Sequence, residues 1–192
     1  MKQVVLIGDS IRMGYQAAVR RELAAVAEVW GPEENGGTSA NVLAHLDEWA
    51  LARSPALVHV NCGLHDLRKA FGEAQSFIPL TQYAANVREV LTRLTAMAGT
   101  RVVWASTTPV DEKRHHAVKG FDRFEADVRA YNAAALAVAA ELGVAVDDLF
   151  AVVTPAGKGR LLGEDGVHFT AEGYDVLGQA VAGCIRMHIR NQ

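Results

Sequence analysis

The sequence predicts a three-layer α/β/α fold, in which helices cover both faces of a five-stranded parallel sheet. Five short, unbroken apolar runs have the composition of strands that are buried on both faces. Segments with helical spacing of apolar residues alternate with these runs, as crossover connections between parallel strands require. No repeat or linker interrupts the chain, so we expect a single domain over residues 1–192.

The first strand and its helix are marked by a change in hydrophobic spacing. Val4–Ile7 is an unbroken apolar run that stops at the tripeptide Gly8-Asp9-Ser10. Apolar residues then recur at helical spacing from Tyr15 onward, which predicts a helix over residues 14–27. A small polar turn therefore lies where a central strand leads into a helix.

The next two strands flank a shorter helix. Residues 28–30 form a brief strand, which a glycine-rich loop follows. Thr38 or Ser39 can cap a helix extending to Trp49, because short hydroxyl side chains accept hydrogen bonds from the free N–H groups of a first turn. Residues 56–60 then form the third strand.

The second half of the chain continues the alternation. We expect a long helix between residues 80 and 99, the fourth strand at residues 101–105 and a charged loop up to residue 120. A further helix ends at Gly143, residues 144–146 form the fifth strand, and an irregular segment leads to a last helix from Thr170. Strands of this number and spacing fit a flavodoxin-like sheet with the order 2-1-3-4-5.

Composition and charge exclude several classes of protein. The net charge of −3 gives no indication of nucleic-acid binding, and no apolar stretch reaches the roughly 18 residues of a membrane span. The N-terminal apolar run is too short for a signal peptide, so we expect a cytoplasmic protein unless a leader has been removed. Cys62 and Cys184 are too few for a disulfide framework and are expected as buried thiols.

Polar segments of the chain should converge at one edge of the sheet, where the carboxyl ends of the strands meet. Ser10 follows the first strand, Gly37 the second, residues 63–66 the third and Thr107 the fourth, while residues 165–168 follow the fifth. Taken alone, the tripeptide ending in Ser10 is more simply explained as a turn and helix cap. The convergence of these segments favours a functional site instead.

Ser10, Asp165 and His168 are the residue types that serine hydrolysis requires. The serine needs a base to remove its proton, and the base needs a carboxylate to hold it in the right tautomer. One turn can fold the Asp165 carboxylate onto Nδ1 of His168, which leaves Nε2 free to face Ser10. The alternative is structural, with Asp165 as a turn former and His168 as a helix-entry residue.

Stabilisation of the tetrahedral intermediate requires hydrogen-bond donors directed at its oxyanion. The backbone N–H groups of Ser10 and Gly37 are candidates, since glycine permits a close approach of the backbone. A side-chain donor can come from His65. The alternative for this histidine is a loop residue whose imidazole is hydrogen-bonded to Asp66.

These residues resemble the blocks of the SGNH (GDSL-like) hydrolase superfamily, in the right order along the chain. The segment from Gly8 to Tyr15 resembles the first block, with Ser10 as nucleophile, and residues 35–39 resemble the second, with Gly37 in the oxyanion hole. Residues 165–168 are similar to the final Asp-x-x-His block. The third block departs from the superfamily pattern Gly-x-Asn-Asp, because His65 stands in place of the asparagine.

The resemblance implies ester hydrolysis through an acyl-enzyme, with neither a metal nor an organic cofactor. Members of the superfamily cleave acetyl groups from sugars, fatty esters, lysophospholipids and thioesters. The charged segment 111–119 and the nearby Arg12 favour a polar or anionic small-molecule or carbohydrate ester, although charged loops are often only solvated. The candidate substrate contacts are Arg12, Asp66, Thr107, His115 and His116. The spacing of the two adjacent histidines does not indicate a metal site.

Two other functions remain open from the sequence. A lipase-like or thioesterase activity would act on longer acyl chains, and a non-catalytic binding module would retain the fold without turnover. A nucleotide-binding protein is less favoured, because the first turn lacks a glycine-rich phosphate cradle. The sequence does not specify an oligomeric state.

Overall fold

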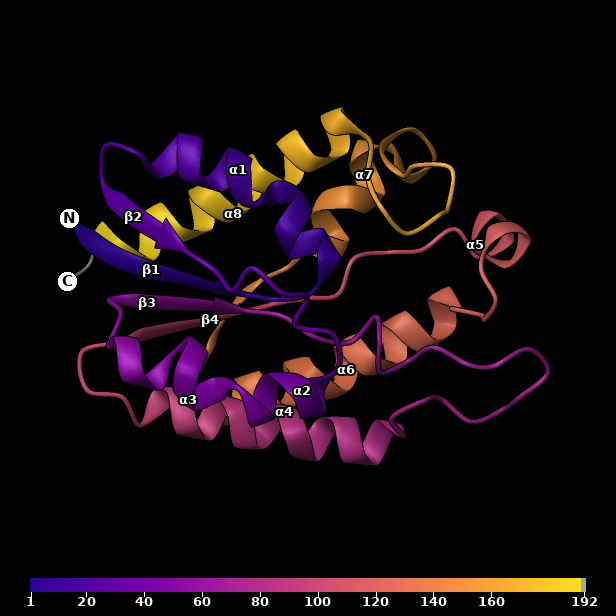
Figure 1. Ribbon diagram of the computed structural model, residues 1–192, viewed down its shortest axis with the longest axis horizontal. Helices are drawn as coiled ribbons and strands as arrows, with labels where there is room; N and C mark the ends of the chain where they lie inside the picture. Colours follow the sequence, from indigo (N-terminus) through magenta and orange to yellow (C-terminus); the bar gives the residue numbers. More distant parts are fainter. Residues whose placement is uncertain (191–192) are drawn as a thin grey trace.

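The computed structural model describes residues 1–190, which form an α/β/α sandwich around one parallel sheet (Figure 1). The order of the strands is β2-β1-β3-β4-β5, which confirms the predicted fold class and strand order. Register brings Val4 of the first strand beside Leu57 of the third, and Val60 beside Trp104 of the fourth. The strands are β1 (Lys2–Ile7), β2 (Ala27–Trp30), β3 (Leu57–Val60), β4 (Arg101–Ala105) and β5 (Ala145–Asp147).

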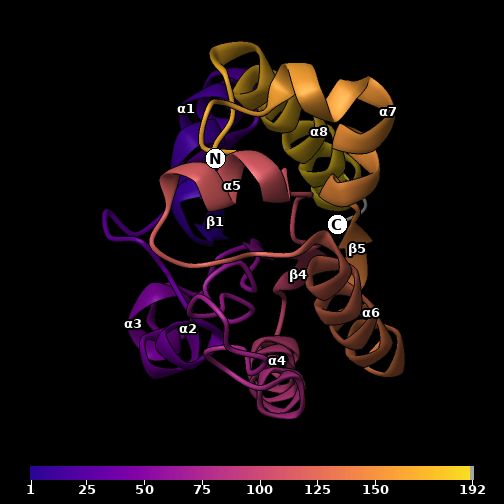
Figure 2. The same cartoon turned by 90° about the vertical axis from the view of Figure 1, so that its right-hand side faces the viewer.

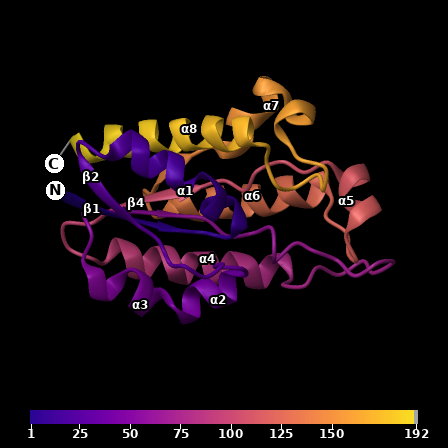
Figure 3. The same ribbon diagram turned by 45° about the horizontal axis from the view of Figure 1, so that its top comes forward.

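Helices cover both faces of the sheet. One face carries α1 (Ser10–Leu23), α7 (Leu149–Leu161) and α8 (Ala171–Arg190) (Figure 2). The opposite face carries α2 (Ser39–Ala44), α3 (Leu46–Trp49), the 3₁₀ turn η1 (Leu51–Arg53), α4 (Leu80–Thr95) and α6 (Glu125–Glu141) (Figure 3). The short helix α5 (Glu112–Val118) lies beyond the carboxyl ends of the strands.

The central strands are buried because helices pack on both sides of them. Residues Val4–Ile7 and all of β3 are buried, as the unbroken apolar runs predicted. Trp49 and Trp104 are among the largest fully buried side chains of the core. Cys62 and Cys184 are buried free thiols, which confirms that expectation. None of the helices within residues 1–190 is both long and apolar enough to cross a membrane.

Helix α1 begins at Ser10, four residues before the predicted start at Gly14. Asp9 caps it, because its Oδ1 accepts the Ile11 N–H at 2.9 Å. The helix ends at Leu23, so the predicted end at residue 27 was also wrong: Ala27 already belongs to β2. Ser10 therefore lies in the first helical turn, where backbone N–H groups have no partner within the helix.

Two helices lie in segments where the sequence predicted loops. Helix α5 occupies part of the charged segment 111–119; seven residues with a single buried side chain give no visible apolar stripe. Helix α7 lies in the segment expected to be irregular, and its pattern is interrupted by Pro155 and by Gly157, whose φ is +99°. The helix expected up to Trp49 is divided at His45 into α2 and α3.

Two glycines allow α1 and α8 to pack closely. A Cβ at Gly14 would lie 2.1 Å from the Tyr174 ring, and a Cβ at Gly178 would lie 2.4 Å from the Ala18 Cβ. No larger side chain fits either place without movement of its neighbours. This packing sets the start of α8, just after His168, beside the first turns of α1, which carry Ser10.

Candidate active site

The structure brings together three of the predicted site residues from opposite ends of the chain. The hydroxyl oxygen of Ser10 lies 2.9 Å from Nε2 of His168. On the other side of the ring, Nδ1 of His168 lies 2.6 Å from Oδ2 of Asp165. With the proton on Nδ1, the imidazole donates to the carboxylate and Nε2 accepts from the Ser10 hydroxyl. This is the arrangement that a serine nucleophile and its base require.

The Asp165 carboxylate is held by several donors. Its Oδ1 accepts the N–H groups of Val167 at 3.1 Å and His168 at 2.9 Å. Partial burial acts to raise its pKa, but the hydrogen bonds from His168, Val167 and Lys119 outweigh burial and lower the pKa of Asp165 below its ordinary value. The carboxylate is therefore ionised at neutral pH, ready to orient the imidazole and to stabilise its cationic form.

Lys119 is a site residue whose role the sequence did not reveal. Its Nζ lies 3.2 Å from Oδ2 of Asp165, the same oxygen that faces His168. The sequence shows Lys119 only as one charge among many in the segment 111–119. Lys119 lies at the end of that segment, next to Gly120, and no sequence motif distinguishes it from the other charged residues there.

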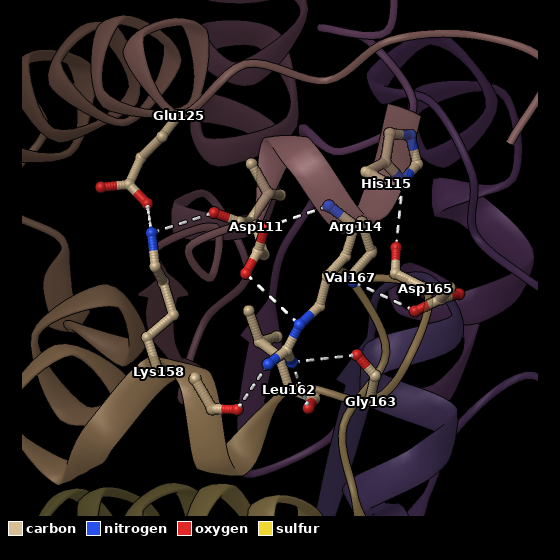
Figure 4. Close-up of polar contacts among 11 residues, drawn as sticks. Asp111, Arg114, His115, Glu125, Lys158, Leu162, Gly163, Asp165 and Val167 are labelled. Carbon is tan, nitrogen blue, oxygen red and sulfur yellow. Dashed lines mark hydrogen bonds and ion pairs between the residues drawn. The ribbon is translucent and has the colours of Figure 1, made fainter. Parts of the chain in front are cut away.

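Helix α5 clamps the segment that carries Asp165 (Figure 4). Arg114 donates to the carbonyl oxygens of Leu162 and Gly159, both at 3.1 Å, and its Nε lies 3.5 Å from Asp111 Oδ2. The Asp111 N–H donates to the carbonyl of Gly166 at 2.8 Å. Hydrogen bonds from two residues of the α5 region thus fix the loop on both sides of the acid.

Gly166 makes the turn between Asp165 and His168 possible. Its φ is +70°, and a Cβ there would lie 2.4 Å from the Asp111 carbonyl oxygen. Glycine reaches this left-handed conformation without the steric cost of a side chain. The turn lets both the backbone and the ring of His168 bond the same carboxylate.

The backbone donors near Ser10 differ in availability. Within residues 1–190, the Ser10 N–H has no hydrogen-bond acceptor, as expected for the first residue of a helix. The Gly37 N–H, in contrast, donates to the exposed Asn35 side chain at 2.9 Å. The Gly37 N–H is therefore engaged with a neighbouring side chain, whereas the Ser10 N–H is available.

His65 is a half-buried imidazole close to the triad. Burial is the main cause that lowers its pKa, and the nearby cations Arg123 and Arg68 act in the same direction. The ring is thus neutral at pH 7, with a single N–H to donate. The alternative of a bond between His65 and Asp66 is wrong: the Asp66 carboxylate accepts instead from the backbone N–H of Ser39, at 3.0 Å, and from its hydroxyl, at 2.5 Å.

Four of the five expected substrate contacts have buried side chains that bond to other parts of the protein. Arg12 donates to Gln16 and to the Glu34 carbonyl, where it ties α1 to the loop after β2. Asp66 is fully buried on Ser39, as described above. Both charged groups therefore have hydrogen-bond partners within the protein.

Thr107 and His115 are the other two buried contacts. The Thr107 hydroxyl donates to the Cys62 carbonyl at 3.3 Å. His115 is the buried residue of α5, and its Nδ1 lies 3.3 Å from the Asp165 carbonyl oxygen. His116 is exposed, with its ring beside Asp122 at 2.7 Å, and remains a predicted contact. Among the residues described, no group of three or more His, Cys, Asp or Glu side chains is placed to hold a metal ion.

The sequence over residues 6–176 matches the model of the GDSL-like Lipase/Acylhydrolase family. The chain belongs to this family. The match covers most of the chain, from β1 into α8, and confirms the resemblance to SGNH (GDSL-like) hydrolases. No curated protein sequence matches the chain.

Solved structures share the fold of this GDSL-like family member over nearly their whole length. A lipase/acylhydrolase from Enterococcus faecalis has a TM-score of 0.82 at 23% identity, covering 97% of this chain and 96% of that one. An acetylxylan esterase from Geobacillus stearothermophilus has a TM-score of 0.75 at 18% identity, covering 98% and 94%. At these identities the likeness concerns the fold.

Proposed function

We propose that this protein is a serine esterase that hydrolyses carboxylic esters through an acyl-enzyme, with Ser10 as nucleophile. The hydrogen-bonded chain from Ser10 through His168 to Asp165 carries the proposal. Family membership supports it, since the matching family consists of lipases and acylhydrolases.

Each residue has a defined role in the proposed reaction. His168 Nε2 removes the Ser10 proton as the hydroxyl oxygen attacks the ester carbonyl, and Asp165 stabilises the imidazolium that forms. The N–H groups of Ser10 and Gly37 and the ring N–H of His65 stabilise the oxyanion. The imidazolium then protonates the departing alcohol, and a water molecule activated by His168 releases the acid from Ser10.

We further propose that the acyl group is short, in particular acetyl, and that the alcohol is polar, as in an acetylated carbohydrate. A hollow formed by residues that follow His65 and Lys119 in the sequence includes polar and charged side chains in its lining, among them Lys69, Gln75 and Ser76. Such a lining suits hydroxyl-rich groups better than a long acyl chain. The fold shared with an acetylxylan esterase is in keeping with this substrate class.

A panel of esters tests this proposal. We expect the protein to hydrolyse nitrophenyl acetate and acetylated xylo-oligosaccharides, with kcat/KM falling as the acyl chain lengthens. Ser10→Ala should abolish turnover, and a fluorophosphonate probe should label the wild type at Ser10 but not the variant. A preference for long acyl chains would favour a lipase-like or thioesterase activity. An unlabelled Ser10 without turnover would indicate a non-catalytic binding module.

A further inference from the structure

A cavity of about 420 Å³ lies between the chain that leads from β3 to α4 and the residues that follow α5. Figure 1 shows this β3–α4 connection looping out beyond the end of α4, on the side of the molecule where α5 lies. The lining residues include Arg68, Glu73, Phe77 and Phe121. No step of the proposed reaction uses any of these residues.

Backbone contacts hold the walls of the cavity in place. Lys69 and Asp122 exchange two backbone hydrogen bonds, of 2.9 and 2.8 Å, which join the two walls. The Lys69 side chain forms an ion pair with Asp127 at 2.7 Å. Across the loop, the Phe77 N–H donates to the Arg68 carbonyl at 2.8 Å. The cavity is therefore formed before any ligand binds, which lowers the entropic cost of binding.

Arg68 is the cation of the cavity with no anionic partner. Its guanidinium lies over the Phe77 ring, 4.1 Å from the centroid, and 5.7 Å from the centroid of Phe121. Within residues 1–190, the guanidinium makes neither a hydrogen bond nor an ion pair. The guanidinium packs on the Phe77 ring while its N–H groups remain unused, and a planar fork of this kind matches a carboxylate.

Two segments of the chain connect the wall of the cavity to residues of the Ser10 site. His65, three residues before Arg68, lies near enough to both Arg68 and His168 for their charges to affect its pKa. Lys119, which pairs with Asp165, immediately precedes Gly120 of the cavity wall. An ester with its carbonyl at Ser10 can thus extend its alcohol portion toward Arg68.

We propose that this cavity binds a carboxylate on the alcohol portion of the ester, with Arg68 as its donor. The inference rests on the proposed esterase function and defines its substrate class: acyl esters of hydroxy acids, including acidic sugars. Phe77 and Phe121 provide apolar walls for the body of the substrate. Glu73 also lines the cavity, and its negative charge acts against the attraction of Arg68 for an anion.

A matched pair of esters tests the inference: 4-acetoxybenzoate, which carries a carboxylate, and its neutral methyl ester. We expect Arg68→Gln to lower kcat/KM for the charged ester at least about ten-fold more than for the neutral one, as for a charge-assisted hydrogen bond. Glu73→Gln should change this ratio in the opposite direction. Arg88→Gln, on an exposed face of α4, is the matched control and should leave the ratio unchanged.

The outcomes separate this inference from the proposed function. An equal loss for both esters in Arg68→Gln would assign Arg68 to the scaffold, and no loss would remove the cavity from substrate binding; either result overturns the inference while esterase activity stands. A larger effect on 4-acetoxyphenyl phosphate than on the benzoate would overturn the assignment to a carboxylate. Absence of turnover on every ester, with Ser10 unreactive toward fluorophosphonate, would overturn both proposals.

Discussion

Asp66→Asn should make the stability of the protein less dependent on pH. Asp66 is fully buried, and its carboxylate accepts the backbone N–H and the hydroxyl of Ser39, whose oxygen in turn accepts from Asn86 at 2.9 Å. Burial raises the pKa of Asp66 to about 6, although the hydrogen bonds from Ser39 act to lower it. The folded protein therefore binds the proton at this carboxyl more tightly than the unfolded chain does.

The interval between pH 3.8, the ordinary pKa, and about 6 sets the magnitude of the effect. One pH unit corresponds to about 1.4 kcal/mol, so ionisation of Asp66 should destabilise the native state by about 3 kcal/mol. This cost is absent below pH 3.8, grows as the pH rises to 6 and is constant above that. The asparagine amide oxygen can accept the same two Ser39 donors but carries no charge.

Chemical denaturation of wild type and Asp66→Asn at pH 4 and pH 7 measures this effect. The free energy of unfolding of the variant, relative to the wild type, should increase by about 2.4 kcal/mol between the two pH values, because about 0.5 kcal/mol of the cost is already present at pH 4. Taking the difference cancels the other titrating groups, and Asp47→Asn, a surface carboxylate paired with Arg93, should show a nearly constant difference. A constant or decreasing difference for Asp66→Asn would refute the reasoning.

Three further predictions concern the site. His65→Ala should lower kcat about 100- to 1,000-fold with little change in KM, and His65→Asn should recover most of the loss; equal kcat in wild type and His65→Ala would exclude His65 from the oxyanion hole. Lys119→Met removes the cation that shares Asp165 with His168, so the carboxylate stabilises the imidazolium better. The acidic limb of the kcat/KM profile should therefore move to higher pH, by up to about 0.7 unit for a part-exposed pair. Lys119→Arg keeps the cation and should not move the limb. Gly166→Ala should lower the free energy of unfolding by about 1–3 kcal/mol and should also lower kcat, because a Cβ there meets the Asp111 carbonyl. Gly183→Ala, at a helix position with open space, should lower neither quantity. Denaturation and steady-state assays measure both.

Sequence reasoning succeeded where local pattern and global packing agree. The apolar run Val4–Ile7 predicts a central strand, because only a strand covered on both faces needs apolar residues at every position. Sequence reasoning failed where tertiary contacts hold a helix that has no apolar stripe of its own. The clamp of Arg114 on the residues before Asp165 helps hold α5 in place, and no pattern in its seven residues indicates this.

The charged residues near the site show the same difference between what the local sequence predicts and what tertiary contacts decide. Arg12 and Asp66 are sequence neighbours of Ser10 and His65, so the sequence made them candidates for substrate binding. The fold directs Arg12 toward the loop after β2 and Asp66 toward Ser39, and both lie buried there. Proximity in sequence does not determine on which side of the backbone a charge is satisfied.

The sequence by itself determined the parallel sheet and the segments that gather at its carboxyl edge, because hydrophobic periodicity and the alternation of strands and helices are local; it favoured the strand order that the structure then showed. Only the tertiary structure decided which polar side chains face that edge: Lys119 meets Asp165, Asp66 turns inward, and Arg68 packs on the Phe77 ring without an anionic partner among residues 1–190. The physical reason is that the direction of a side chain depends on partners distant in sequence, whose positions are set when the helices pack against the sheet.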